Sequence, residues 1–183
     1  MFAFDPLRTL AAWGSLARMA EQSDTDFTAL IPELPQWNDG AGIDAESWIG
    51  CVGNFELATG YSLIFWPGFV RFEGYVLREG FGEGGLGEEG LRGFEQQPSP
   101  NDASIETVRA SVEAVMNHVH IADIHCNVQP TEAQLRYLGR VLKDIHEVKL
   151  RRDFPDLRFV VSFNDEPNLD LIDYQLTFWQ AVD

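Results

Sequence analysis

The sequence predicts an α+β fold, with a small, mostly antiparallel sheet of about three strands packed against three or four helices on one face. Three observations favour this class. Two long segments in the second half of the chain place apolar residues at helical spacing, and three shorter segments alternate apolar with polar residues. A turn at residues 165–168 separates the last two of these strands, which favours antiparallel pairing. The length of 183 residues suits a single domain over residues 1–183.

The first third of the chain is predicted to consist of two helices joined by a loop. An Asp-Pro pair starts a helix expected over residues 6–22, since Asp caps helices and Pro is tolerated at the first helical position. Residues 23–44 contain prolines, glycines and acidic residues, which is typical of a loop. Residues 46–66 have apolar residues at helical spacing despite three glycines, and Pro67 favours a helix end just before it.

The middle of the chain holds one predicted strand and a connector. Residues 69–77 alternate between two faces, one of them strongly apolar, which predicts a strand. Residues 79–102 follow as an acidic connector that is rich in glycine, and we expect this connector to be flexible.

Two helices with clear start signals follow the connector. Asp102 or Ser104 is expected to cap the first, whose apolar pattern runs at least to Val119. Thr131 and Gln134 match a capping box at the start of the second. The apolar stripes are Ile105, Val108, Val112, Val115, Met116 and Val119 in the first helix, and Leu135, Leu138, Leu142, Ile145 and Val148 in the second. Strands are predicted over residues 157–164 and 173–180, and with residues 69–77 they form the expected sheet.

The charge of the chain excludes several kinds of partner. Thirteen Lys and Arg against 29 Asp and Glu give a net charge of −16, and no basic residue lies between Arg18 and Arg71. Such a field repels phosphates, so nucleic acid and anionic membranes are poor partners, while a basic protein or a cation is favoured. The alternative interpretation is that the acidity only keeps the protein in solution.

The expected compartment is the cytoplasm. Two cysteines make no disulfide framework, and the N-terminus lacks the basic region of a signal peptide. No apolar run is long enough to cross a membrane.

The residues best suited to metal chemistry lie close together in the sequence. They are His118, His120, Asp123, His125 and Cys126. If the helix continues through His120, the first two histidines diverge around its last turn, where they complement exposed carbonyl groups. If it ends before His118, His118, His120 and His125 could converge with Asp123 or Cys126 on zinc, and three such ligands with a water would make a catalytic site. We favour the first interpretation, and we expect neither a metal nor a cofactor.

The other catalytic patterns are incomplete. Cys126 beside His125 is conceivable as a nucleophile pair, although proximity in sequence does not provide the required arrangement in space. Residues 80–85 satisfy the Gly-x-Gly-x-x-Gly pattern, but their acidic surroundings would repel a dinucleotide. Cys51 lies among apolar residues at helical spacing and is expected to pack in the core.

Acidic and aromatic side chains form the alternative candidate site, a surface that binds another protein. Trp is favoured at interfaces, and carboxylates would attract a basic partner. The candidate residues are Asp24, Asp26, Glu33, Trp37, Asp39, Asp44, Glu83, Glu88 and Glu89.

The segment LIFWPGFVRFEGYVLREGF, followed by VEAVMNHVHIADIH, resembles small acidic bacterial proteins of the toxin-immunity type, which bind and neutralise a toxin made by the same cell. The resemblance covers residues 54–125. It implies a bacterial cytoplasmic protein that binds another protein. The first hypothesis is therefore a non-enzymatic binder of a basic partner. The alternative function is that of a small metal-dependent hydrolase that uses His118, His120 and His125.

Overall fold

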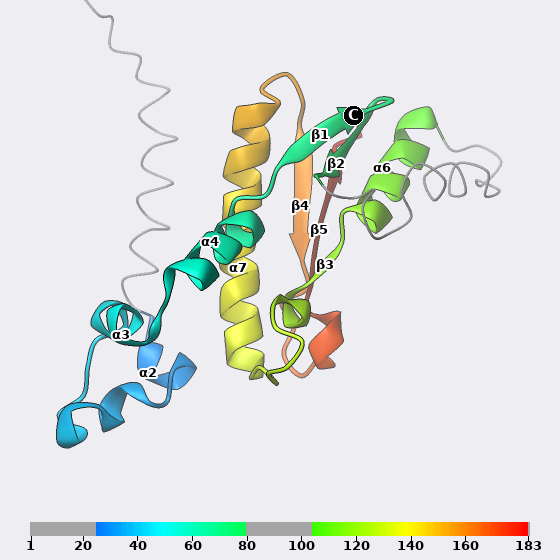
Figure 1. The fold of residues 1–183 in the computed structure, drawn as a ribbon. Helices are drawn as coiled ribbons and strands as arrows, with labels where there is room; N and C mark the ends of the chain where they lie inside the picture. Colours follow the sequence, from blue (N-terminus) through cyan, green and yellow to red (C-terminus); the bar gives the residue numbers. More distant parts are fainter. Residues whose placement is uncertain (1–24, 80–103, 183) are drawn as a thin grey trace, which may run out of the picture. The chain divides into compact units, whose positions relative to one another are not determined.

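The computed structural model describes residues 25–79 and 104–182 and confirms the α+β class (Figure 1). The helix predicted over residues 6–22 and all but the first residue of the predicted connector lie outside the described residues. Contacts divide the chain into two compact units, Met1–Val52 and Gly53–Asp183. The single domain expected over residues 1–183 stays a prediction.

The described part of the first unit is made of short helices. The predicted loop contains α2 (Phe27–Leu30) and two 3₁₀ turns, η1 (Leu34–Gln36) and η2 (Asn38–Gly40), and α3 (Ala45–Val52) follows. Leu34 is the one buried residue among residues 25–52. The core of this part is therefore very small.

The helix predicted over residues 46–66 is in fact two helices. α3 ends at Val52, and α4 (Phe55–Phe65) begins after Asn54, whose backbone is extended and whose side chain accepts a hydrogen bond from Leu57 N. Asn is a strong helix cap, so a new helix starts here instead of continuing through the glycine before it. The predicted end before Pro67 is confirmed, because α4 ends at Phe65.

The strand predicted over residues 69–77 is a hairpin. β1 (Phe69–Phe72) pairs antiparallel with β2 (Tyr75–Arg78), and Glu73 and Gly74 form the two-residue loop. Both loop residues have positive φ, 49° and 90°, which a type I′ turn requires and which glycine adopts readily. The apolar alternation continues across this turn and therefore conceals it.

The main sheet has three antiparallel strands in the order β3-β5-β4. β4 (Phe159–Phe163) pairs along its length with β5 (Gln175–Gln180), as predicted for the last two strands. The third strand is the short β3 (Val119–His120), which pairs with the start of β5. The expectation that residues 69–77 belong to this sheet is wrong, because the edge of β5 beyond β3 is occupied by side chains of α6 (Ile105–Met116).

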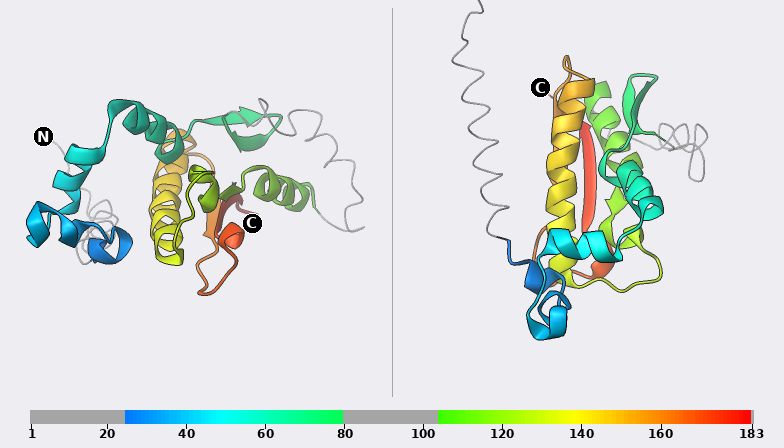
Figure 2. Two further views of the ribbon diagram at one scale, coloured as in Figure 1. Left: turned by 60° about the horizontal axis from the view of Figure 1, so that its bottom comes forward. Right: turned by 60° about the vertical axis from the view of Figure 1, so that its left-hand side comes forward.

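The longest helix, α7 (Glu132–Asp153), runs along β4 and β5 (Figure 2). The predicted capping box of Thr131 and Gln134 is present in full. The buried stripe is rotated from the predicted one, since Val148 is exposed and Gly139 and His146 are buried. The buried residues are Leu135, Gly139, Leu142, His146, Lys149 and Leu150.

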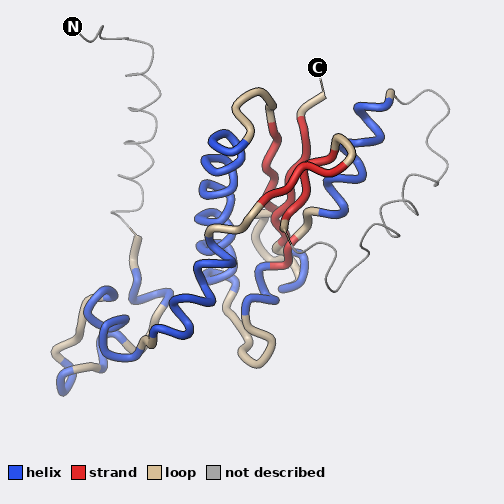
Figure 3. The backbone as a smooth tube through the Cα atoms, turned by 45° about the horizontal axis from the view of Figure 1, so that its top comes forward, coloured by secondary structure: helices blue, strands red, loops and turns tan. Residues whose placement is uncertain are grey.

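Helix α6 joins the hairpin to the sheet, and Figure 3 shows both sets of strands between α7 and α6. Ser104 caps this helix as predicted, while Ile105 and Val115 from the predicted stripe are exposed. The side chains that form the join are polar. Glu113 is 0% exposed and Asn117 is also buried.

The carboxyl group of Glu113 accepts hydrogen bonds from both sets of strands. Its Oε1 atom accepts from Val76 N of β2 at 2.7 Å and from Gln180 Nε2 at 2.5 Å, and its Oε2 atom accepts from Gln180 N of β5 at 2.6 Å. Hydrogen bonds to a charged acceptor contribute about 1.5–3 kcal/mol each. The carboxyl group therefore accepts backbone hydrogen bonds that a strand lying between β2 and β5 would otherwise accept.

Asn117 extends the same join by one helical turn. Its Nδ2 atom donates to Val76 O and Phe178 O, and its Oδ1 atom accepts from Arg78 N. Thr177 on β5 also donates to Ala114 O of the helix. We refer to Glu113, Asn117 and their partners on β2 and β5 as the α6 bridge.

The end of α4 is held to α7 by a cation on aromatic rings. Lys149 is buried, its ammonium group forms an ion pair with Asp153 at 2.5 Å, and it lies 5.3 Å from the ring centre of Trp66 and 5.6 Å from that of Phe69. Arg152 lies 5.2 Å from the Trp66 ring. Such contacts contribute about 0.5–2 kcal/mol each.

We expect Gly139→Ala to destabilise the fold by about 1–3 kcal/mol, because an added Cβ would lie 2.0 Å from Cζ of Phe163. Helix propensity alone predicts the opposite sign, a gain of about 1 kcal/mol. Gly60→Ala on α4 is the matched control, since its Cβ would meet nothing within 4 Å. Chemical denaturation measures the unfolding free energy of the two variants. Equal changes for Gly139→Ala and Gly60→Ala would contradict the close packing of Gly139 on Phe163.

We expect Glu113→Gln to destabilise the fold by about 1–3 kcal/mol although it preserves shape, because all three partners of Glu113 are donors and an amide NH₂ must face at least one of them. Glu56→Gln, at an exposed position of α4, should change stability by less than about 0.5 kcal/mol. Denaturant titration compares the unfolding free energies of the two variants. If Glu113→Gln changed stability as little as Glu56→Gln, the proposed role of the α6 bridge would be contradicted.

Candidate functional site

The histidine-rich stretch begins where α6 ends, and the helix ends earlier than predicted. Its last residue is Met116, Asn117 is its C-cap, and Val119 already pairs with Leu176 in the sheet. The prediction that the helix continues through Val119 is therefore wrong. The physical reason is that Asn117 and Val119 have partners on β2 and β5. These interactions outweigh the helical spacing of apolar residues that predicted a longer helix.

His118 and His120 lie next to each other. Nδ1 of His118 is hydrogen-bonded to the carbonyl oxygen of Val115, and Nδ1 of His120 lies 2.7 Å from that of Ile172. Because a carbonyl oxygen only accepts, both Nδ1 atoms are protonated, and in each neutral ring Nε2 keeps a lone pair. The two rings meet edge to face with centroids 5.1 Å apart. His118 thus supports the helix end as expected, although through a hydrogen bond from beyond the last turn.

His125 is engaged elsewhere. It follows η3 (Ile121–Ile124), and its Nε2 atom is hydrogen-bonded to the hydroxyl of Tyr61 on α4, 2.5 Å away. Its ring also meets the Tyr61 ring edge to face, with centroids 5.6 Å apart. The sequence does not indicate Tyr61 as a partner, because no local pattern relates it to His125, which lies 64 residues further along the chain.

The other candidate ligands do not complete a three-ligand site. Asp123 belongs to η3, and Cys126 is exposed in the turn that follows. Within residues 25–79 and 104–182, no group of three or more His, Cys, Asp and Glu side chains is placed to hold a metal ion. The arrangement required by the alternative hydrolase hypothesis, with His125 beside the other two histidines, is therefore not formed.

The fourth histidine, His146, is a core residue that the sequence did not single out as buried. Burial lowers the pKa of His146 to about 4, and the nearby positive charges of Arg78 and Lys149 act in the same direction. Its Nδ1 atom is hydrogen-bonded to Leu142 O, and its ring packs edge to face on Phe69. The side chain is neutral at neutral pH.

The acidic candidate residues of the first unit are exposed. Asp26, Glu33, Asp39 and Asp44 all face solvent, and Trp37 is half-buried. Asp24, Glu83, Glu88 and Glu89 lie outside the described residues.

Two of the acidic residues also hold the backbone in place. Asp26 caps α2, and hydrogen bonds from Thr28 lower the pKa of Asp26. Asp44 accepts a hydrogen bond from Ser47 N at the start of α3, which lowers the pKa of Asp44.

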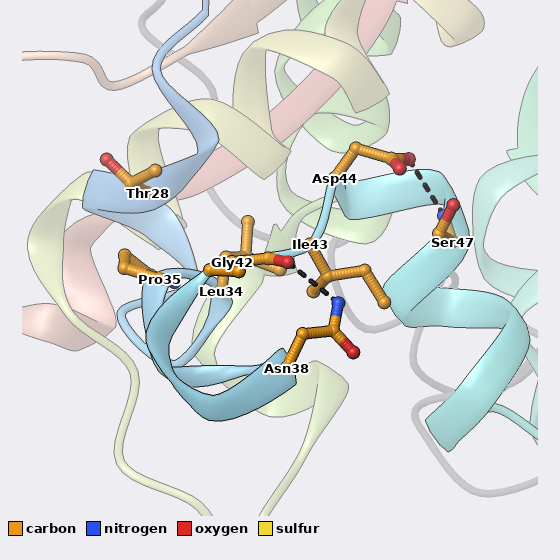
Figure 4. A pocket seen from close by; sticks show the side chains of 9 residues that line it. Thr28, Leu34, Pro35, Asn38, Gly42, Ile43, Asp44 and Ser47 are labelled. Carbon is orange, nitrogen blue, oxygen red and sulfur yellow. Dashed lines mark hydrogen bonds between the residues drawn. The ribbon is translucent and has the colours of Figure 1, made fainter.

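A hollow between α2 and the start of α3 is drawn in Figure 4. The figure shows its polar groups paired within the chain: Asn38 Nδ2 donates to Gly42 O at 2.9 Å, and Asp44 accepts from Ser47 N at 2.9 Å. The loop around the hollow is therefore held in place by its own hydrogen bonds.

Exposed apolar side chains on α3 and α4 are a feature that the sequence did not indicate. Neither helix contains a buried residue, and Phe55 at the start of α4 is 90% exposed. Cys51 is also exposed, so the expectation that it packs in the core is wrong. Helical spacing of apolar residues predicts an apolar face, but it does not say what covers that face.

No protein-family model, no curated protein and no solved structure matches the chain. None of the helices among the described residues has the length and apolar character that a membrane span requires.

The depressed pKa of His146 predicts acid sensitivity. The pKa of His146 is about 4 in the folded state, below its ordinary value of 6.5, so the unfolded chain binds the proton more tightly. The stability contribution of His146 should be complete above pH about 6.5 and be lost as the pH falls towards about 4, by roughly 3 kcal/mol. Urea titrations at several pH values measure this loss.

The comparison that isolates the effect is His146→Leu, since the carboxylates titrate alike in both proteins. The difference in unfolding free energy between wild type and variant should change across this pH window and stay flat above it. His125→Ala serves as the control for loss of a histidine outside the core. A pH-independent difference for His146→Leu would contradict the buried, neutral imidazole.

Proposed function

We propose that this protein binds another protein, basic on its contacting face, through the exposed acidic surface of residues 25–52. The observation that supports the proposal is the charge of this segment. It contains five carboxylates and no Lys or Arg, and all five are exposed: Asp26, Glu33, Asp39, Asp44 and Glu46.

The physical effect of such a surface is greatest on association. Carboxylates without neighbouring cations produce a negative potential that attracts a basic partner and raises the association rate, and salt screens this attraction. A Debye length of about 10 Å at 0.1 M salt means that neighbouring carboxylates act together on an approaching charge.

Exposed apolar side chains of the same segment would supply the buried part of such an interface. Ile49 and Val52 on α3 are 59% and 46% exposed, and Trp37 is half-buried. An apolar centre with a polar rim is the usual arrangement of protein interfaces, and Trp is frequent among their strongest contacts. Residues 25–52 thus carry both the charged and the apolar side chains that such an interface needs.

The finer proposal is that the partner is neutralised by binding, as in the toxin-immunity proteins that the sequence resembles. A basic catalytic face of a toxin is a partner of the required charge, and covering that face would block it without any catalysis by this protein. The acidic segment supports this proposal by its charge.

The test is reversal of two carboxylates that do not hold the backbone. Glu33 and Glu46 neither cap a helix with their side chains nor adopt positive φ, whereas Asp26 and Asp44 cap and Asp39 has a φ of 57°. Glu33→Lys/Glu46→Lys should reduce capture of a basic partner from the native host at least tenfold, and salt of about 0.5 M should reduce wild-type capture similarly. Affinity capture followed by mass spectrometry measures both.

Asp156→Lys provides the matched control, because it reverses an exposed charge outside residues 25–52. It should leave capture unchanged. A partner retained equally by the double variant and by Asp156→Lys, or at both salt concentrations, would show that the acidic segment is not the binding surface.

A further inference from the structure

We propose that His118 and His120 together bind one divalent metal ion of the zinc type through their Nε2 atoms. This site uses residues of the second unit, whereas the acidic surface consists of residues 25–52. It differs from the three-histidine hydrolase site in that the chain supplies two ligands only. Zinc and its neighbours in the first transition row favour imidazole nitrogen.

The separation of the two rings fits a shared ion. Imidazoles on one tetrahedral zinc, with Zn–N distances of about 2.0–2.1 Å, have ring centroids about 5 Å apart. The centroids of His118 and His120 are 5.1 Å apart. The backbone therefore already holds the two rings at the separation that one shared ion requires.

The partners of the Nδ1 atoms provide the second, independent observation. Histidines that bind metals through one nitrogen almost always donate the other N–H to a carbonyl or a carboxylate, which fixes the tautomer and the orientation of the ring. His118 donates to Val115 O and His120 donates to Ile172 O, so both rings have this outer support. Both Nε2 atoms are left to act as ligands.

The backbone around the pair is held from two sides. His120 pairs with Gln175 of β5, and Ile121 N donates to Tyr174 O just after it. His118 directly follows Asn117, whose side chain belongs to the α6 bridge. His118 is exposed, so the remaining positions on the ion would be open to water or to a group from another molecule.

The experiment titrates the full-length, metal-free protein with Zn²⁺ alone, in competition with a chromophoric zinc indicator. Wild type should bind one ion per chain, and His118→Ala and His120→Ala should each lower the affinity about tenfold or more. His125→Ala is the matched control, since this neighbouring ring is held by Tyr61. It should bind zinc as wild type does.

A second pair of variants separates ligand loss from misfolding. His118→Gln and His120→Gln each keep an N–H donor for the carbonyl oxygen and remove the imidazole, so circular dichroism should stay unchanged while zinc affinity falls. In wild type, zinc should shift the ¹⁵N resonances of both Nε2 atoms and leave both Nδ1 atoms protonated. Absence of saturable binding, undiminished binding in His118→Gln/His120→Gln, or an equal loss in His125→Ala would overturn the proposal.

Discussion

The α6 bridge is the interaction on which the second unit depends. β2 has a strand neighbour, β1, on one side only, and β5 lies between β4 and the short β3, which pairs with the start of β5 alone. The open side of β2 and the later part of β5 therefore present backbone groups that a further strand would normally pair. Glu113 and Asn117 meet these groups with side-chain oxygens and nitrogen atoms, so a helix joins the hairpin to the sheet. A buried carboxyl group is costly unless its hydrogen bonds are made, and here three N–H groups from the two sets of strands make them.

The same constraint determines where the histidines lie. Because Asn117 is held between β2 and β5, α6 cannot continue, and the chain turns into β3 immediately afterwards. His118 and His120 are thereby placed beside each other instead of diverging around a helix. Their contact is thus a consequence of the fold, whereas His125 is directed to α4 by Tyr61. The acidic surface of residues 25–52 belongs to the other unit, which has a very small core of its own among its described residues.

Much of the fold could be predicted because its signals are local. The capping box of Thr131 and Gln134, the cap at Ser104 and the alternation in the last two strands all act within a few residues. Three features could not be predicted in this way. The Glu73-Gly74 turn is hidden by an apolar pattern that continues across it, the burial of Glu113 depends on strands 37 and 67 residues away in sequence, and Tyr61 meets His125 across 64 residues. The charge of the acidic segment could be predicted, since charge is a property of composition, but the exposed apolar residues of α3 and α4 could not.

Amide hydrogen exchange tests the central role of the bridge most directly. The amides of Val76 and Gln180 donate to Glu113, and that of Arg78 donates to Asn117. If the bridge joins hairpin and sheet into one cooperative body, these three amides exchange as slowly as the amides in the middle of the β4–β5 ladder, where Val161 pairs with Phe178. Exchange of Val76 and Arg78 much faster than that of the β4–β5 amides would show that the hairpin opens alone, and would contradict this account.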